Sequence, residues 1–293
     1  MNTNTPTALL HRVDICFVID TTGSMSGFLN EAKKRLIGTL EALSGQSKID
    51  LHVGLVEFRD HPPQDNSFIT QVTNLTGTIK AIQSTIDKLK ADGGGDGPEA
   101  VYRGIADACN QLAWREHSIR YILLVGDSPP HGFATWFEQY GPTQTASQQA
   151  DQSVAVPRGR GRARHGLGIV DSWPRECPSG LNVQSVSALC EKRGIMVHAL
   201  ALGRSPGAHE SFTAIALATG GTFRTMEHHT DAIQLITNVL SAEFANVVFD
   251  AEVLEAAQEF DPPDSAVISQ KLDCPRLKVA SSLARLGRRG FLT

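Results

Sequence analysis

Short apolar runs alternate with helical patterns along most of the chain. The run at 13–19 (VDICFVI) stops abruptly at Asp20, and similar runs cover 119–125 and 195–202. Continuous apolar runs of this length are typical of parallel strands that are buried on both faces. Further strands are expected at 49–58, at 222–225 and, as an edge strand, at 68–72.

Between these runs, apolar residues recur at the three- and four-residue spacing of helices. From Phe28 to Leu43 the spacing predicts a helix that closes at Gly45. Strands that alternate with helices predict a doubly wound α/β fold, Rossmann-like, whose mostly parallel sheet carries helices on both faces. Further helices are expected at 76–89, 98–114, 183–192, 211–218 and 231–244.

Two stretches do not fit this alternation. Residues 139–166 pass from a Gln/Ser/Thr-rich segment into a basic Arg/Gly run, which favours a flexible insertion. Residues 249–293 contain a Pro-Pro break and a cluster of Arg and Lys, which indicates a helix followed by a weakly specified basic tail. With 293 residues, the chain therefore divides into a main domain at 10–248 and this C-terminal extension.

Composition and charge limit the functions and the cellular location that we expect for the chain. The net charge of -4 and a pI near 6.2 exclude a globally basic nucleic-acid-binding protein. Because no apolar run reaches about 18 residues and no secretory signal pattern precedes residue 14, we expect no membrane span and a cytoplasmic location. The five scattered cysteines suit reduced thiols, with a Cys177–Cys190 disulfide as the alternative.

Three acidic loops fall where ligands bind in this class of fold, at the carboxyl ends of the strands. Asp20, Thr22 and Ser24 follow the first strand, Asp96 lies in the loop GGGDGPE, and Asp127 follows the strand at 119–125. Two carboxylates from neighbouring strand ends, with alternating hydroxyls, form a set of hard oxygen ligands. Such a set favours Mg²⁺ or Mn²⁺.

These loops resemble the metal-ion-dependent adhesion site of von Willebrand factor A domains. The signature of that site is D-x-S/T-x-S after the first strand, a Thr or Asp on a second loop and an Asp on a third. Asp96 departs from the usual Thr, and this variant is similar to hemicentin-like domains and to domains that accompany alpha-kinases. Similar stretches lie at 58–63, 127–131 and 171–180, so the resemblance covers about 13–244.

The resemblance implies a protein–protein interaction module without catalysis. Asp20, Thr22 and Ser24 would bind the cation directly or through water, and Asp96 and Asp127 would complete its shell. A carboxylate of a partner protein would then occupy the open coordination position. Neither a membrane nor a small-molecule substrate is expected.

Other interpretations remain open. The acidic residues could instead cap a helix or begin an Asx turn, and Glu99 is interpreted as a helix-dipole partner rather than a ligand. A metal-dependent hydrolase would use the same crevice, with Arg59 as the nearest cation. A nucleic-acid-associated scaffold would use the Arg/Gly run, which otherwise suits an acidic partner. The candidate partner-contact rim is His61, His131 and Arg59. The candidate phosphate or acidic-partner contacts are Arg158, Arg160, Arg162 and Arg164. A less favoured zinc site would use His131, His165, Cys177 and Cys190.

Overall fold

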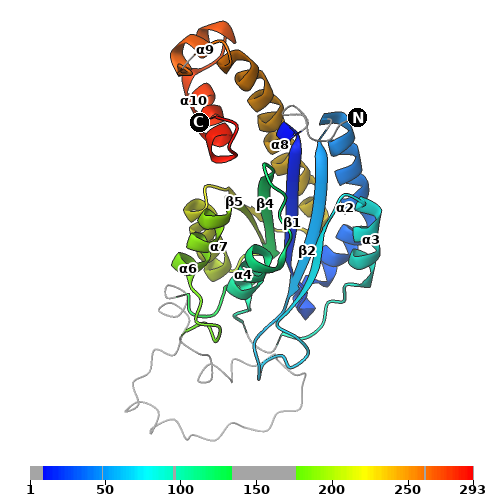
Figure 1. Ribbon diagram of the computed structural model, residues 1–293. Helices are drawn as coiled ribbons and strands as arrows, with labels where there is room; N and C mark the ends of the chain where they lie inside the picture. The colour runs from blue at the N-terminus through cyan, green and yellow to red at the C-terminus, as the bar shows by residue number, and fades with distance from the viewer. Residues whose placement is uncertain (1–8, 48, 95–96, 134–175, 261, 293) are drawn as a thin grey trace, which may run out of the picture.

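The computed structural model describes residues 9–47, 49–94, 97–133, 176–260 and 262–292 (Figure 1). At its centre lies a sheet of six strands in the order β3-β2-β1-β4-β5-β6. All neighbouring strands are parallel except β3, an antiparallel edge strand beside β2. The strands are β1 (Arg12–Asp20), β2 (Asp50–Phe58), β3 (Thr70–Thr76), β4 (Ile119–Gly126), β5 (Ile195–Leu202) and β6 (Phe223–Met226).

Helices cover both faces of this sheet, which confirms the predicted doubly wound fold (Figure 1). On one face α2 (Ser26–Ser47), α3 (Ile79–Lys88) and α8 (Ala232–Ala257) enclose one hydrophobic core with β1, β2 and β4. On the other face α4 (Val101–Gln111), α6 (Val183–Arg193) and α7 (Pro206–Ala218) enclose a second core. Successive side chains of β1 enter opposite cores, because Ile15 and Phe17 belong to the first and Cys16 and Val18 to the second.

The start of α4 differs from the prediction. The helix begins at Val101, and Glu99 precedes it in extended pairing with Pro130. The Glu99 amide donates to the Pro129 carbonyl at 2.9 Å, and the next amide, of Ala100, donates to the Arg59 carbonyl at 2.9 Å. This segment thus extends the sheet beyond the end of β1, so Glu99 is not the first-turn dipole partner that the sequence suggested.

The C-terminal part of the chain is more ordered than predicted. Helix α8 passes without a break through the proposed boundary at 248, and α9 (Ser265–Lys271) and α10 (Arg276–Arg288) follow it. These helices enclose a third hydrophobic cluster, which includes Phe249, Ile268 and Leu286. The segment His229–Ala257 is long and apolar enough to span a membrane by length and composition, but its apolar residues contribute to the first and third cores.

The cysteines do not pair as the sequence alternative proposed. All five are free thiols, and Cys177 and Cys190 have different neighbours. The sulfur of Cys190 lies 3.6 Å from that of Cys109, whereas the sulfur of Cys177 lies 3.7 Å from Nε2 of His61.

Candidate metal site

The first loop of the candidate site begins at Asp20, the last residue of β1. Its side chain is fully buried. Oδ1 accepts hydrogen bonds from the amide of Thr22 at 2.8 Å and from its hydroxyl at 2.7 Å. Oδ2 is also buried, and no hydrogen-bond donor reaches it from the described residues. One carboxylate oxygen therefore organises the loop while the other is left for a ligand.

The hydroxyls of Thr22 and Ser24 stand side by side, with their oxygens 3.4 Å apart. The 3-10 turn η1 (Gly23–Met25) produces this spacing, and the buried side chain of Met25 anchors the turn in the first core. Thr22 is buried while Ser24 is exposed. The row from Asp20 to Ser24 therefore runs from the interior to the surface, as a cation site open to solvent on one side requires.

Asp127 directly follows β4, the neighbour of β1, and its side chain is half-buried. Its charge acts on Asp20: repulsion from Asp127 is the second-largest cause, after burial, that raises the pKa of Asp20 to about 7. Asp20 also packs against the end of β4: a Cβ on Gly126 would be in ordinary van der Waals contact with it, 3.4 Å from the Cβ of Asp20 and 3.5 Å from its Oδ2.

The second loop is attached to the first by backbone hydrogen bonds. The Asp92 amide donates to the Thr21 carbonyl at 3.0 Å, and the Gly23 amide donates to the Gly93 carbonyl at 3.2 Å. Gly93 and Gly94 have φ values of 75° and 77°, which favour glycine. Asp96 itself lies outside the described residues.

Glu99 is a site residue that the sequence interpretation undervalued. It is 3% exposed. A Cβ on Gly94 would lie 3.0 Å from both Glu99 Oε1 and Thr22 Cβ, so the carboxylate comes close to the first loop. The sequence signal for its place in the site was its position in GGGDGPE. We predicted a helix beginning at Pro98, however, and in such a helix Glu99 would have pointed elsewhere.

The expected partner-contact rim is wrong for this structure, because Arg59, His61 and His131 are all buried. Nε2 of His131 lies 2.5 Å from Oδ1 of Asp60, a contact that joins the loop after β2 to the loop after β4. Burial and the neighbouring His131 lower the pKa of His61 to about 4. These two imidazoles therefore position the loops from inside.

Arg59 is equally engaged. Its guanidinium donates to the hydroxyls of Thr21 at 3.4 Å and Ser67 at 3.1 Å, and to the Lys90 carbonyl at 3.1 Å. It also lies over the ring of Phe68. All three guanidinium nitrogens of Arg59 are therefore engaged, and they fix the first loop relative to its neighbours.

The zinc alternative lacks support among the described residues. No cluster of three or more His, Cys, Asp or Glu side chains there has a metal-binding arrangement. Cys190 faces Cys109 rather than His131. His165 and the basic run of Arg158, Arg160, Arg162 and Arg164 lie outside the described residues.

The described residues fit a hard divalent cation. Asp20 supplies a buried oxygen that lacks a hydrogen-bond partner, two hydroxyls lie in line with it, and Asp127 is near enough to repel it. All of these groups offer oxygen, which Mg²⁺ and Mn²⁺ prefer. A cation there would remove both the repulsion and the unsatisfied buried oxygen.

A doubly wound α/β domain with aligned hydroxyls and acidic loops at the carboxyl edge of its sheet defines a class of ligand-binding domains. Residues 14–129 match the family model of the von Willebrand factor A domain. Domains of this family generally act as interaction modules rather than enzymes.

Two curated proteins resemble part of the chain. Alpha-protein kinase vwkA of Dictyostelium discoideum is 30% identical over 127 residues, which are 41% of this chain and 19% of that protein. The putative ariadne-like RING finger protein R811 of Acanthamoeba polyphaga mimivirus is 29% identical over 119 residues, which are 41% of this chain and 11% of that protein. The chain thus spans less than a fifth of either relative.

Among solved structures, the pilus adhesin SpaC from Lactobacillus rhamnosus GG, in its open conformation, has the same fold. Its TM-score is 0.53 at 15% sequence identity, over 80% of this chain and 30% of the adhesin. At this identity the likeness establishes the fold alone.

Proposed function

We propose that this chain is a metal-dependent protein-interaction module. Asp20, Thr22, Ser24 and Asp127 hold Mg²⁺ or Mn²⁺, and Asp96 from the second loop completes the shell. A bound cation supplies Lewis acidity toward an outside oxygen ligand. A partner's Asp or Glu carboxylate occupies the coordination position on the solvent side, next to the exposed Ser24.

One observation carries this proposal: Oδ2 of Asp20 is buried with no hydrogen-bond donor among the described residues, and the charge of Asp127 acts on the same carboxylate. Burying a carboxylate oxygen without a partner costs several kcal/mol or more, and a cation is the ligand that reverses this cost. The two neighbouring hydroxyls add no charge to the shell, so they leave the ion more affinity for an outside carboxylate than further carboxylate ligands would.

The hydrolase alternative is weaker than the interaction module. Phosphate hydrolysis needs a cation beside the metal to offset the developing charge. Arg59, the candidate from the sequence, is buried and donates to Thr21, Ser67 and Lys90. We also propose a cytoplasmic location, supported by the proximity of Cys109 and Cys190 as free thiols.

The proposal is tested first with the metal alone and then with the partner. Isothermal titration of the chain with Mg²⁺ or Mn²⁺ should show one site, and Asp20→Ala should remove it with little loss of stability, since the buried charge leaves together with its ion. A pull-down from native lysate, with and without EDTA, should then recover a partner only when the divalent ion is present.

The matched control is Asp87→Ala, which removes an exposed carboxylate from α3. It should leave both metal binding and partner binding unchanged. If Asp20→Ala still bound the metal, the site would be misplaced. If the metal bound but the partner were held equally well in EDTA, the cation would be structural and partner recognition would lie elsewhere.

A further inference from the structure

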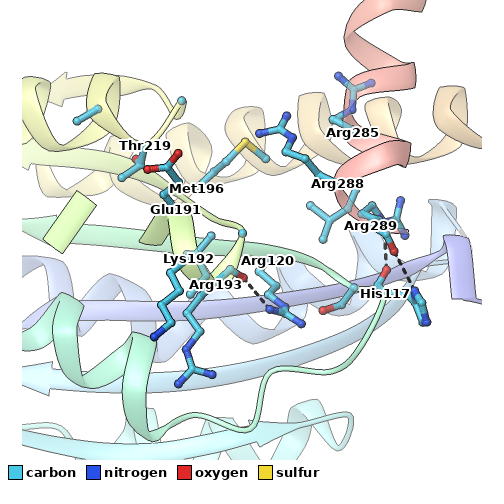
Figure 2. Close-up of a pocket in the computed structure, with 16 residues that line it drawn as sticks. His117, Arg120, Glu191, Lys192, Arg193, Met196, Thr219, Arg285, Arg288 and Arg289 are labelled. Atoms are coloured by element: carbon cyan, nitrogen blue, oxygen red, sulfur yellow. Dashed lines mark hydrogen bonds between the residues drawn. The ribbon is translucent and has the colours of Figure 1, made fainter. Parts of the chain in front are cut away.

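A cleft of about 620 Å³ lies at the edge of the sheet opposite the candidate metal site. The starts of β4 and β5 and the ends of α6 and α7 form one side, and α10 forms the other (Figure 2). Six of its 16 lining residues are Arg or Lys, and Glu191 is the one carboxylate among the lining residues. The cations are Arg120, Lys192, Arg193, Arg285, Arg288 and Arg289.

The cations form two groups that face the cleft from opposite sides (Figure 2). Lys192 and Arg193 end α6, and Arg285 and Arg288 end α10, so part of their role is to offset helix dipoles. That explanation does not extend to Arg120, which lies on β4. Dipole compensation alone therefore does not account for the cluster.

Acidic groups neutralise the cluster only in part. Asp250 on α8 pairs with Arg285, at 2.5 Å from Oδ1 to Nη2. The same carboxylate is 4.0 Å from Nη1 of Arg289. That nitrogen and Nε of Arg120 are buried, and neither has a hydrogen-bond partner among the described residues.

Backbone carbonyls hold two of these guanidinium groups in place. Arg120 donates to the carbonyls of Arg193 at 2.6 Å and Arg115 at 2.9 Å. Arg289 donates to the carbonyls of His117 at 3.0 Å and Leu10 at 2.6 Å. Arginines fixed in this way lose little conformational freedom when an anion binds, and phosphate oxygens match their planar donor groups.

We propose that this cleft binds a compact ligand with several phosphate groups, of the inositol polyphosphate type. Its volume lies within the roughly 300–1,000 Å³ of small-molecule sites. The cations surround it from two sides, which suits a compact polyanion better than an extended strand. A free inositol polyphosphate and the headgroup of a phosphoinositide lipid share this chemistry.

Isothermal titration with inositol hexakisphosphate, in EDTA so that the metal site takes no part, tests the proposal. The wild-type chain should bind one molecule, with an affinity that falls as salt is raised. The double variant Lys192→Ala/Arg193→Ala should bind about tenfold more weakly, since each exposed cation contributes a few-fold. Both side chains are exposed, so the variant should fold normally.

The matched control is Lys34→Ala/Arg35→Ala, which removes a consecutive Lys-Arg pair from α2. It should bind like the wild type. Absence of binding to the wild-type chain, or equal weakening in both variants, would overturn the proposal. Sedimentation with phosphatidylcholine vesicles, with and without phosphatidylinositol 4,5-bisphosphate, then separates the two sources: cosedimentation that Lys192→Ala/Arg193→Ala abolishes supports the lipid headgroup, and soluble binding without it supports the free ligand.

Discussion

Asp20 is buried with Asp127 and Asp60 nearby, and this position sets its protonation. Burial, with repulsion from Asp127 next, raises its pKa from 3.8 to about 7. Without metal, the folded chain therefore holds a proton on Asp20 up to about pH 7, whereas the unfolded chain releases it near pH 3.8. The carboxylate form is the one that binds a cation, so the site favours metal most strongly above this range.

The pH dependence of stability should report this state. As pH rises from about 4 to 7, the metal-free chain should lose on the order of 4 kcal/mol relative to Asp20→Asn, because only the folded state must bury the new charge. At pH 7, Mg²⁺ should raise the melting temperature of the wild-type chain and not that of Asp20→Asn. Urea unfolding and thermal melting at several pH values in EDTA measure these effects.

The exposed Asp87→Asn serves as the control and should follow the wild-type pH profile. The idea fails if Asp20→Asn and the wild type share one profile in EDTA, since that result would place Asp20 in a solvated environment.

The residues that the sequence could locate are those whose position depends on one strand end. Asp20, Thr22, Ser24 and Asp127 directly follow apolar runs, so the sheet edge fixes their place. Asp60 and His131 form a pair only because two loops 71 residues apart meet, and no local pattern records that distance. The burial of Asp60 and His131 could therefore not be predicted from the sequence, from which we placed His131 in a surface rim.

At the scale of elements, strands were easier to predict than helix ends. The apolar runs of β1, β4 and β5 are bounded by polar residues or glycines, and their predicted limits agree with the structure within a residue or two. Helix α4 begins three residues after its predicted start, because Glu99 makes sheet-like backbone hydrogen bonds with the segment after β4. Helices α9 and α10 were missed because α9 has only seven residues and Arg and Lys interrupt the apolar positions of α10; packing on α8 stabilises both.

The Gly-rich second loop offers a test of how loop backbone supports the site. Gly94→Ala should cost about 1–2 kcal/mol for its positive φ and should also weaken Mg²⁺ binding, because the new methyl group would lie 3.0 Å from Thr22 Cβ and Glu99 Oε1. Gly203→Ala has a similar φ of 75° with no atom within 4 Å, so it should lose stability alone.

Chemical denaturation of both variants measures the cost of backbone strain, and metal titration measures the effect of the new contact with Thr22 and Glu99. Equal metal affinity in Gly94→Ala and Gly203→Ala would mean that the second loop does not position Thr22.

At the scale of the whole molecule, the two candidate sites occupy opposite ends of the same strands. Asp127 follows the end of β4, while Ile119 and Arg120 at its start line the cationic cleft. The C-terminal helices form the far wall of that cleft, and Arg289 attaches them to the backbone at Leu9, Leu10 and His117. Residues beyond 248 therefore contribute to the same folded body rather than to a separate tail.

A double-mutant cycle on Asp250 and Arg285 tests whether the C-terminal helices and the sheet unfold as one body. Asp250 is fully buried on α8, and it accepts hydrogen bonds from Arg285 and from Ser282 of α10. Arg285→Ala should destabilise the chain by about 3 kcal/mol, because it leaves the buried Asp250 carboxylate with Arg289, at 4.0 Å, as its remaining cationic neighbour, and adding Asp250→Ala should recover part of that loss. Urea unfolding gives the free energies, and hydrogen exchange of peptides from β1 and β4 shows whether the loss reaches the sheet.

If Arg285→Ala lowered protection in α9 and α10 while the strands stayed protected, the C-terminal helices would unfold on their own. Loss of protection in both regions would make the sheet and its C-terminal helices one cooperative unit, in which occupancy of the cleft stabilises the strands that carry the metal loops.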